Sequence, residues 1–262
     1  MELGLHGKRA IVTGGTRGIG KACAVELARE GADVCIVGRD RDLLEAGVAA
    51  LTALGVRATG VAADLTRAEE CASAVEHCVA TLGGVDILVN SAGAARMEAI
   101  LALKVETIQD ALDLKLFGYL RMAQLAIPHM KERSWGRIVN IAGGAGTSPA
   151  AGNIPTSLAN IGVLNITRAL SDAVSGDGIL VNTICPGLTN TDRARDLARG
   201  RAEREGRDIE AIVAEMGKGV PAGRMAEPEE IARVAVFLAS EACSYVHGSS
   251  VYMDGGGRRA TP

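Results

Sequence analysis

The 262-residue chain is poor in aromatic residues, which make up 2% of it, while hydrophobic residues as a whole make up 48%. Its core must therefore be built from alanine, valine, leucine and isoleucine, which suits close packing of helices on a sheet. The chain also lacks an excess of positive charge, since 28 Lys and Arg face 31 Asp and Glu. Proteins that bind nucleic acid usually present a basic face, so this balance argues against a nucleic-acid partner.

Other absences exclude further classes of protein. The first residues contain no long apolar run and no cleavage-site pattern, so we expect neither a signal peptide nor a membrane span. The six cysteines form no CxxC pair and lie in apolar segments, which favours buried, reduced thiols in a cytoplasmic protein. The four histidines are far apart and show no metal-ligand spacing, so no metal site is expected.

Short apolar runs alternate with longer helical patterns along the chain. Strands are expected at 9–14, 33–38, 57–62, 85–90, 136–143, 179–184 and 249–256. Helices are expected at 18–31, 43–55 and 67–83, then up to about Pro128, after residues 156–160, within 192–217 and after Pro228. Apolar strands that are each followed by a helix predict a parallel sheet covered on both faces. We therefore expect a single α/β domain over 1–262, with a Rossmann-like, doubly wound sheet of seven parallel strands.

The turn after the first expected strand reads TGGTRGIG, residues 13–20. Gly14, Gly18 and Gly20 in this turn allow the backbone to bend sharply and to approach a pyrophosphate at the N-terminus of the next helix. Glycines that serve only the packing of the turn are the alternative. The place of this pattern between a first strand and its helix favours dinucleotide binding.

Further motifs make the chain resemble the short-chain dehydrogenase/reductase family over nearly its whole length. They are the TGxxxGxG spacing, NSAG at 90–93, CPGLTNT at 185–191 and the closing VYMDGG. The resemblance implies a nicotinamide cofactor, a small-molecule substrate, a substrate lid at about 189–220 and a homotetramer. The implied cofactor-binding residues are Gly14, Thr16, Arg17, Gly18, Ile19, Gly20, Arg39, Asp64, Leu65, Asn90, Ala92, Gly93, Asn160, Pro186, Gly187, Thr189 and Thr191.

The end of the second expected strand bears on the choice of nicotinamide. An enzyme that prefers NAD carries an acid there, which accepts hydrogen bonds from the ribose. This chain has Gly38 followed by Arg39, and Arg17 lies in the glycine turn. Arginine binds a phosphate through charge-assisted, forked hydrogen bonds, so the pattern favours NADP(H) over NAD(H). The alternative is that Arg39 is a solvated surface residue and that Asp40 caps the following helix.

Four positions to which the resemblance assigns catalysis depart from the family's pattern. The family has a serine, a tyrosine, a lysine and an asparagine, and the aligned positions here hold Gly143, Thr156, Asn160 and Lys115. The chain contains no tyrosine between residues 119 and 245, so a short shift of register does not restore one. A threonine hydroxyl is a far weaker acid than a phenol. The family's usual proton transfer therefore cannot operate unchanged.

The lysine and the asparagine have exchanged places, which keeps one ammonium and one carboxamide in the expected pocket. We predict that Lys115 points toward the nicotinamide, that Asn160 binds the cofactor ribose, and that Thr156 donates a hydrogen bond to the substrate oxygen. The alternative is that the exchange is chance and that Lys115 extends to the surface or pairs with Asp113 or another nearby acid.

Three functions remain open at this point. The first is an atypical oxidoreductase that acts on a carbonyl, a hydroxyl or an activated C=C, whose developing enolate needs hydrogen bonds more than a phenolic acid. The second is a non-catalytic NADP-binding protein that acts as a sensor or as a partner subunit. The third is a lyase or isomerase with no net redox change. The intact cofactor motifs favour the first two, and the sequence does not indicate the substrate.

Overall fold

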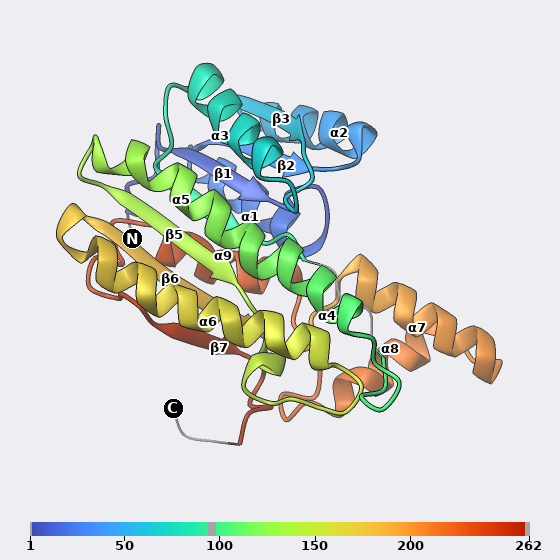
Figure 1. Ribbon diagram of the computed structural model, residues 1–262. Helices are drawn as coiled ribbons and strands as arrows, with labels where there is room; N and C mark the ends of the chain where they lie inside the picture. The colour runs from blue at the N-terminus through green and yellow to red at the C-terminus, as the bar shows by residue number, and fades with distance from the viewer. Residues whose placement is uncertain (1, 94–97, 260–262) are drawn as a thin grey trace.

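The computed structural model describes residues 2–93 and 98–259 and is shown in Figure 1. These residues form a single α/β domain around one parallel sheet with the strand order β3-β2-β1-β4-β5-β6-β7. The prediction of a doubly wound, seven-stranded sheet is confirmed. The strands are β1 (Arg9–Thr13), β2 (Asp33–Gly38), β3 (Ala58–Ala62), β4 (Ile87–Asn90), β5 (Gly136–Ile141), β6 (Ile179–Pro186) and β7 (Ser250–Met253).

Helices cover both faces of the sheet (Figure 1). One face carries α1 (Gly18–Arg29), α2 (Arg41–Thr52) and α9 (Pro228–Leu238), and the other carries α3 (Ala68–Leu82), α5 (Gly118–Lys131) and α6 (Ile154–Val174). Successive strand residues point to opposite faces. Val12 and Ile36 therefore join the core of the first face, while Ile11 and Cys35 join the core of the second.

The strand order reverses beside β1, which pairs with both β2 and β4. In open α/β sheets such a reversal leaves a crevice at the carboxyl ends of the strands, and ligands bind there. The glycine turn after β1 and the segment after β4 both lie at this crevice. So do the turn Gly144–Gly146 after β5 and the segment that follows β6.

The helical segment before β5 differs from its prediction. It consists of α4 (Val105–Ala111), the π-helical stretch η1 (Leu112–Phe117) and α5, which continues to Lys131. The predicted end near Pro128 is wrong because this proline occupies the last turn, where its missing N–H removes a single helical hydrogen bond. The π-helical stretch carries Lys115, and such stretches often occur at functional sites.

Two helices, α7 (Asp192–Glu205) and α8 (Ile209–Lys218), form the predicted insertion beyond the sheet. They pack on each other through a small apolar core of their own, which includes Ala198, Ala202 and Ile212. On the surface, Arg201 and Arg207 each bind both Glu205 and Glu215. The pair is thus a helical hairpin held together largely by its own contacts.

The described ranges contain no helix with both the length and the apolar character that a bilayer crossing requires. All six cysteines are buried and free of disulfides. In the same ranges no three His, Cys, Asp or Glu side chains are grouped as a metal site would require.

Candidate active site

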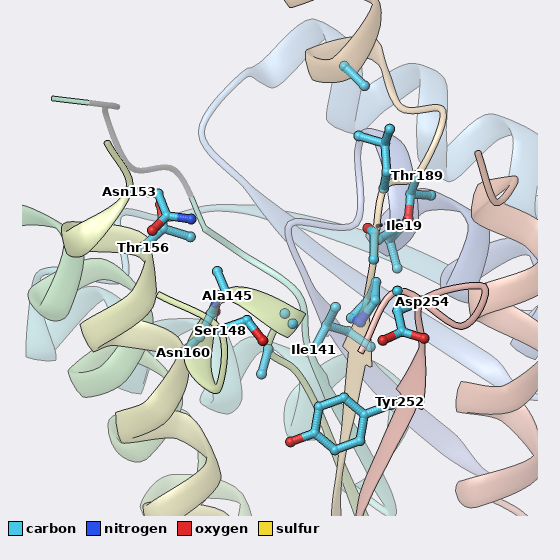
Figure 2. Close-up of a pocket in the computed structure, with 18 of the residues that line it drawn as sticks. Ile19, Ile141, Ala145, Ser148, Asn153, Thr156, Asn160, Thr189, Tyr252 and Asp254 are labelled. Atoms are coloured by element: carbon cyan, nitrogen blue, oxygen red, sulfur yellow. Dashed lines mark hydrogen bonds between the residues drawn. The ribbon is translucent and has the colours of Figure 1, made fainter. Parts of the chain in front are cut away.

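Two cavities meet at the carboxyl ends of the strands. The glycine-loop cavity has a volume of about 470 Å³ and lies over the turn after β1. The α6 cavity has a volume of about 660 Å³ and lies between the first turns of α6, the end of β6 and the segment after β7 (Figure 2). The two share the residues Ile19, Lys115, Ile141, Ala142, Thr191 and Arg193. Both volumes are within the usual range for small-molecule sites.

The glycine turn is shaped for a close approach of backbone to ligand. Gly14 and Gly18 have φ angles of 65° and 52°, in the left-handed region that favours glycine. A Cβ atom on Gly20 would lie 2.2 Å from the carbonyl oxygen of Gly14, so a larger residue does not fit there. Within the described part of the chain, no side chain caps the N-terminus of α1. Its first N–H groups are therefore free to bind an anion such as a pyrophosphate.

Most of the predicted cofactor residues come together around these cavities. The glycine-loop cavity is lined by Gly14, Thr16, Arg17, Gly18, Ile19, Gly20, Arg39, Leu65, Ala92, Gly93 and Thr191. Pro186, Gly187, Thr189 and Asn160 line the α6 cavity, together with Thr191. An elongated dinucleotide fits this arrangement, with the glycine turn and the N-terminus of α1 at one end and the residues of the α6 cavity at the other.

Two predicted cofactor residues do not line either cavity. The Oδ1 atom of Asp64 accepts hydrogen bonds from the backbone N–H and the hydroxyl of Thr66, at 3.0 and 2.9 Å, and these bonds lower the pKa of Asp64. Asn90 is fully buried, and its Nδ2 donates to Oδ1 of Asn140 at 3.0 Å. The Asp64 side chain therefore shapes its own loop and the Asn90 side chain links β4 to β5, while the nearby Leu65 and Ala92 face the cavity.

Two arginines line the glycine-loop cavity, Arg39 just after β2 and Arg17 in the turn before α1. A Cβ atom on Gly38 would lie 3.0 Å from Cγ2 of Thr16, so the strand end is tightly packed. Arg39 and Arg17 both line this cavity and are exposed. Asp40 caps α2 by accepting from the backbone N–H of Leu43, and it also lies 3.6 Å from Arg17. The capping role considered for Asp40 is therefore present, but it leaves Arg39 on the cavity.

Lys115 points into the wall common to both cavities. Its Nζ donates to the carbonyl oxygen of Ala142 at 2.9 Å, and its side chain lies beside Gly93. The alternative ion pair with Asp113 does not form, because Asp113 binds Arg121 at 2.8 Å. Burial lowers the pKa of Lys115 from its ordinary 10.5 to about 8, with a smaller contribution in the same direction from the charge of Arg193. Desolvation destabilises the charged amine, so the proton is held less tightly than on a surface lysine.

Asn160 packs closely against the turn after β5. It is 2% exposed, and a Cβ atom on Gly143 would lie only 2.8 Å from its Nδ2. On its other side, a Cβ atom on Gly146 would lie 3.0 Å from Cβ of Asn160. Among the described residues, Oδ1 of Asn160 has no hydrogen-bond partner. A buried acceptor without a partner is costly, which suggests that this oxygen accepts from a bound ligand.

Thr156 lies one helical turn before Asn160 on α6, and both line the α6 cavity (Figure 2). The sequence prediction missed other polar residues around this cavity, namely Thr147, Ser148, Asn153, Arg193, Tyr252, Asp254 and Arg258. Tyr252 and Asp254 lie within the closing VYMDGG motif, which marked this segment but not its contact with the cavity. Ser148 and Asn153 lie in the loop before α6, where no motif marks them.

Known proteins resemble this chain in sequence and in structure. A family profile described as enoyl-(acyl carrier protein) reductase matches residues 14–257. The 3-oxoacyl-[acyl-carrier-protein] reductase FabG of Aquifex aeolicus is 34% identical over 257 residues, which cover 98% of this chain and 99% of the relative. The D-beta-hydroxybutyrate dehydrogenase of Cupriavidus necator is 34% identical over 254 residues, covering 96% and 98%. The crystal structure of L-sorbose reductase from Gluconobacter frateurii, complexed with NADPH and L-sorbose, matches with a TM-score of 0.97 at 32% identity and covers both chains fully.

The fold and the joined cavities define an oxidoreductase of the Rossmann type. The extent of these matches shows that the chain belongs to the short-chain dehydrogenase/reductase family.

Proposed function

We propose that the chain is an NADP(H)-dependent oxidoreductase in which Lys115 takes the place of the family's tyrosine as the proton-carrying group. Its substrate is a small molecule with a carbonyl, a hydroxyl or an activated C=C. The observation that carries this proposal is the position of the Lys115 ammonium in the wall common to both cavities, with a pKa of about 8. Such an amine holds a proton at neutral pH and releases it far more readily than a threonine hydroxyl does.

The cofactor is held by groups that line the two cavities. The free N–H groups at the start of α1 bind the pyrophosphate, and Arg39 with Arg17 binds the 2′-phosphate of NADP(H). Oδ1 of Asn160 accepts a hydrogen bond from a ribose hydroxyl, which supplies the partner that this buried atom lacks within the chain. The NADPH complex of L-sorbose reductase supports the choice of cofactor. When bound, the nicotinamide supplies or accepts a hydride.

The residues of the α6 cavity orient the substrate and stabilise its oxygen. Lys115 has three N–H donors, and its contact with Ala142 uses one of them. The others are available to a substrate oxygen that becomes negatively charged, either an alkoxide or an enolate. Thr156 donates a further hydrogen bond but does not transfer a proton. Gly143 adds no side chain and leaves room for the amide of Asn160.

The segment 189–220 acts as a lid over the substrate in this proposal. Arg193 and Leu197 of α7 line the α6 cavity, as do Gly219 and Val220 beyond α8. The hairpin has its own core and its own ion pairs, so it can move as a unit.

The assembly proposed is a cytoplasmic homotetramer. Phe117 and Leu158 are exposed at the end of η1 and on α6, and Phe237 and Tyr245 are exposed on α9 and just beyond it. By resemblance to the family, we expect subunits to pair through the helices at 107–132 and 153–175 and through the last helix and strand, and these side chains lie on or beside those segments. Light scattering that reports a particle of 27 kDa at micromolar concentration would contradict the tetramer.

The test of the function is a screen of NADPH consumption against aldehydes, ketones, sugars, oxo acids and enones. The proposal predicts that at least one compound is reduced with one NADPH consumed for each product formed, and that NADH supports the reaction less well. Tight NADPH binding without turnover across the whole set would instead favour the non-catalytic protein. Conversion of a compound without net change in NADPH would favour a lyase or isomerase.

A further inference from the structure

The segment that follows β7 turns back on itself and places Arg258 against the α6 cavity. Asp254 organises this turn, since its Oδ1 accepts from the backbone N–H of Gly256 at 3.0 Å and its Oδ2 from that of Arg258 at 2.8 Å. Gly255 and Gly256 adopt the left-handed φ angles that the turn needs, 62° and 84°. The guanidinium of Arg258 then lies over the ring of Tyr252, 4.1 Å from its centroid.

Arg258 differs from the other two cations that line the α6 cavity. Lys115 and Arg193 line both cavities, whereas Arg258 lines only this one. Among the described residues, no carboxylate oxygen lies within 4.0 Å of its guanidinium. The only acid of the described residues that lines the cavity is Asp254, whose oxygens already accept two backbone N–H groups. Arg258 is thus a cation on the cavity wall that no carboxylate of the described residues pairs with.

The position of Arg258 over Tyr252 leaves its guanidinium able to bind an anion. A guanidinium 4.1 Å from the centroid of an aromatic ring is attracted to the ring face, and its N–H groups can still donate to the two oxygens of a carboxylate or a phosphate. Tyr252 and Asp254 lie on the wall that faces Thr156 and Asn160 across the cavity (Figure 2). A molecule that spans the cavity therefore has α6 on one side and the Arg258–Tyr252 pair on the other.

The charge of the cavity also favours an anionic ligand. Among the described residues, Lys115 and Arg258 line the cavity together with the one carboxylate of Asp254. The buried thiol of Cys185 lies on β6 directly opposite Tyr252 of β7. Burial raises the pKa of this thiol, while the charges of both Lys115 and Arg258 oppose that rise. Both cations therefore act on the same part of the cavity, and their combined field favours an anionic ligand.

We propose that the substrate carries an oxyanion, a carboxylate or a phosphate, and that Arg258 binds it at the end of the molecule away from the reacting carbon. This inference rests on the proposed function in taking the α6 cavity as the substrate site. It adds a substrate class and assigns Arg258 as the residue that selects it. The exposed Arg259 beside it lines neither cavity and provides a matched control.

The test is calorimetry on the intact protein saturated with NADP⁺. The ligands are straight-chain oxo acids of three to six carbons, each compared with its methyl ester, and dihydroxyacetone phosphate compared with dihydroxyacetone. We expect an anionic member to bind about ten to a hundred times more tightly than its neutral partner, as the loss of a charge-assisted contact implies. The two arms distinguish a carboxylate from a phosphate.

The variants assign the effect to Arg258. Arg258→Gln should abolish the preference for the anion, while Arg259→Gln should keep it. The fold should survive Arg258→Gln, because Asp254 binds the backbone of residue 258 and not its side chain. Equal binding of anionic and neutral ligands, or no binding of either, would overturn the inference, and so would a preference that survives Arg258→Gln. Calorimetry measures binding and needs no hydride transfer. A failure of the proposed function in the NADPH screen would therefore not decide whether Arg258 binds an anion.

Discussion

A change at Gly143 tests how tightly the altered site is built. The φ angle of Gly143 is 162°, an extended conformation that any residue adopts, so alanine is not excluded by the backbone. Its Cβ atom, however, would lie 2.8 Å from Nδ2 of Asn160. Asn160 is 2% exposed, so its amide has little room to move away from the new methyl group. Overpacking of this kind usually costs about 1–3 kcal/mol.

The matched control is Gly144→Ala, one residue later in the same turn. The nearest atom to a Cβ at Gly144 is the carbonyl oxygen of Pro186, 3.8 Å away, so the methyl group fits without displacement. We expect Gly144→Ala to change the unfolding free energy by less than about 1 kcal/mol. Gly143→Ala should lower Tm by about 2–4 °C for each kcal/mol in a domain of this size, measured at equal protein concentration.

A double-mutant cycle then separates the contact from other effects. Asn160→Ala removes the amide that the new methyl group meets, so Gly143→Ala should cost much less in that background. The single variant Gly143→Ala should also bind NADPH more weakly, because the new methyl group displaces Asn160. The reasoning is refuted if Gly143→Ala is as harmless as Gly144→Ala, or if its cost is unchanged when Asn160 is already alanine.

Three further changes have defined outcomes. Arg39→Ala should weaken NADPH binding about ten- to a hundredfold and leave NADH binding nearly unchanged, and calorimetry that finds equal losses would contradict a role at the 2′-phosphate. The pKa of Lys115 is about 8 in the folded protein and 10.5 ordinarily. Below pH 8 the buried lysine is charged, and its destabilising effect on the folded state has its full size. This effect disappears as the pH rises from 8 to 10.5, because the folded state loses the proton first. The wild type should therefore gain on the order of 1–3 kcal/mol relative to Lys115→Met between these limits, and parallel denaturation curves across that range would argue against a buried ammonium. Glu215→Gln removes the acid that binds both Arg201 and Arg207, so it should speed amide exchange in α7 and α8 while changing global stability by less than about 1 kcal/mol. Unchanged exchange there would show that the ion pairs do not hold the lid.

The sheet could be predicted from the sequence because its signal is local. Each buried strand is a short apolar run, and each is followed by a helix with a polar face, so both the element type and the parallel order follow. The end of α5 could not be predicted in the same way, because Pro128 normally marks a helix end and only the last-turn geometry shows that it does not. The π-helical stretch around Lys115 also leaves no mark in the apolar pattern.

The site could be predicted only as far as the motifs reach. Alignment on the motifs brought Lys115, Gly143, Thr156 and Asn160 to one cavity, and a lysine partly buried there is expected to have a lowered pKa. The extent of that burial appears only in three dimensions. The inward role expected for Asp64 depended on its side-chain direction, and the bonds to Thr66 set that direction. Likewise, Arg258 returns to the cavity through a turn whose hydrogen bonds appear only in three dimensions.

The most direct test of the central claim measures turnover and NADPH affinity together in Lys115→Met. The control is Lys104→Met, since Lys104 is exposed before α4 and lines neither cavity. With the substrate found in the NADPH screen, the account predicts that Lys115→Met lowers kcat about a hundredfold or more, the usual contribution of a general acid, while its Kd for NADPH stays near that of the wild type. Lys104→Met should match the wild type in both. Turnover by Lys115→Met within about threefold of the wild type would contradict the account, since a group that carries the proton cannot be removed at so small a cost.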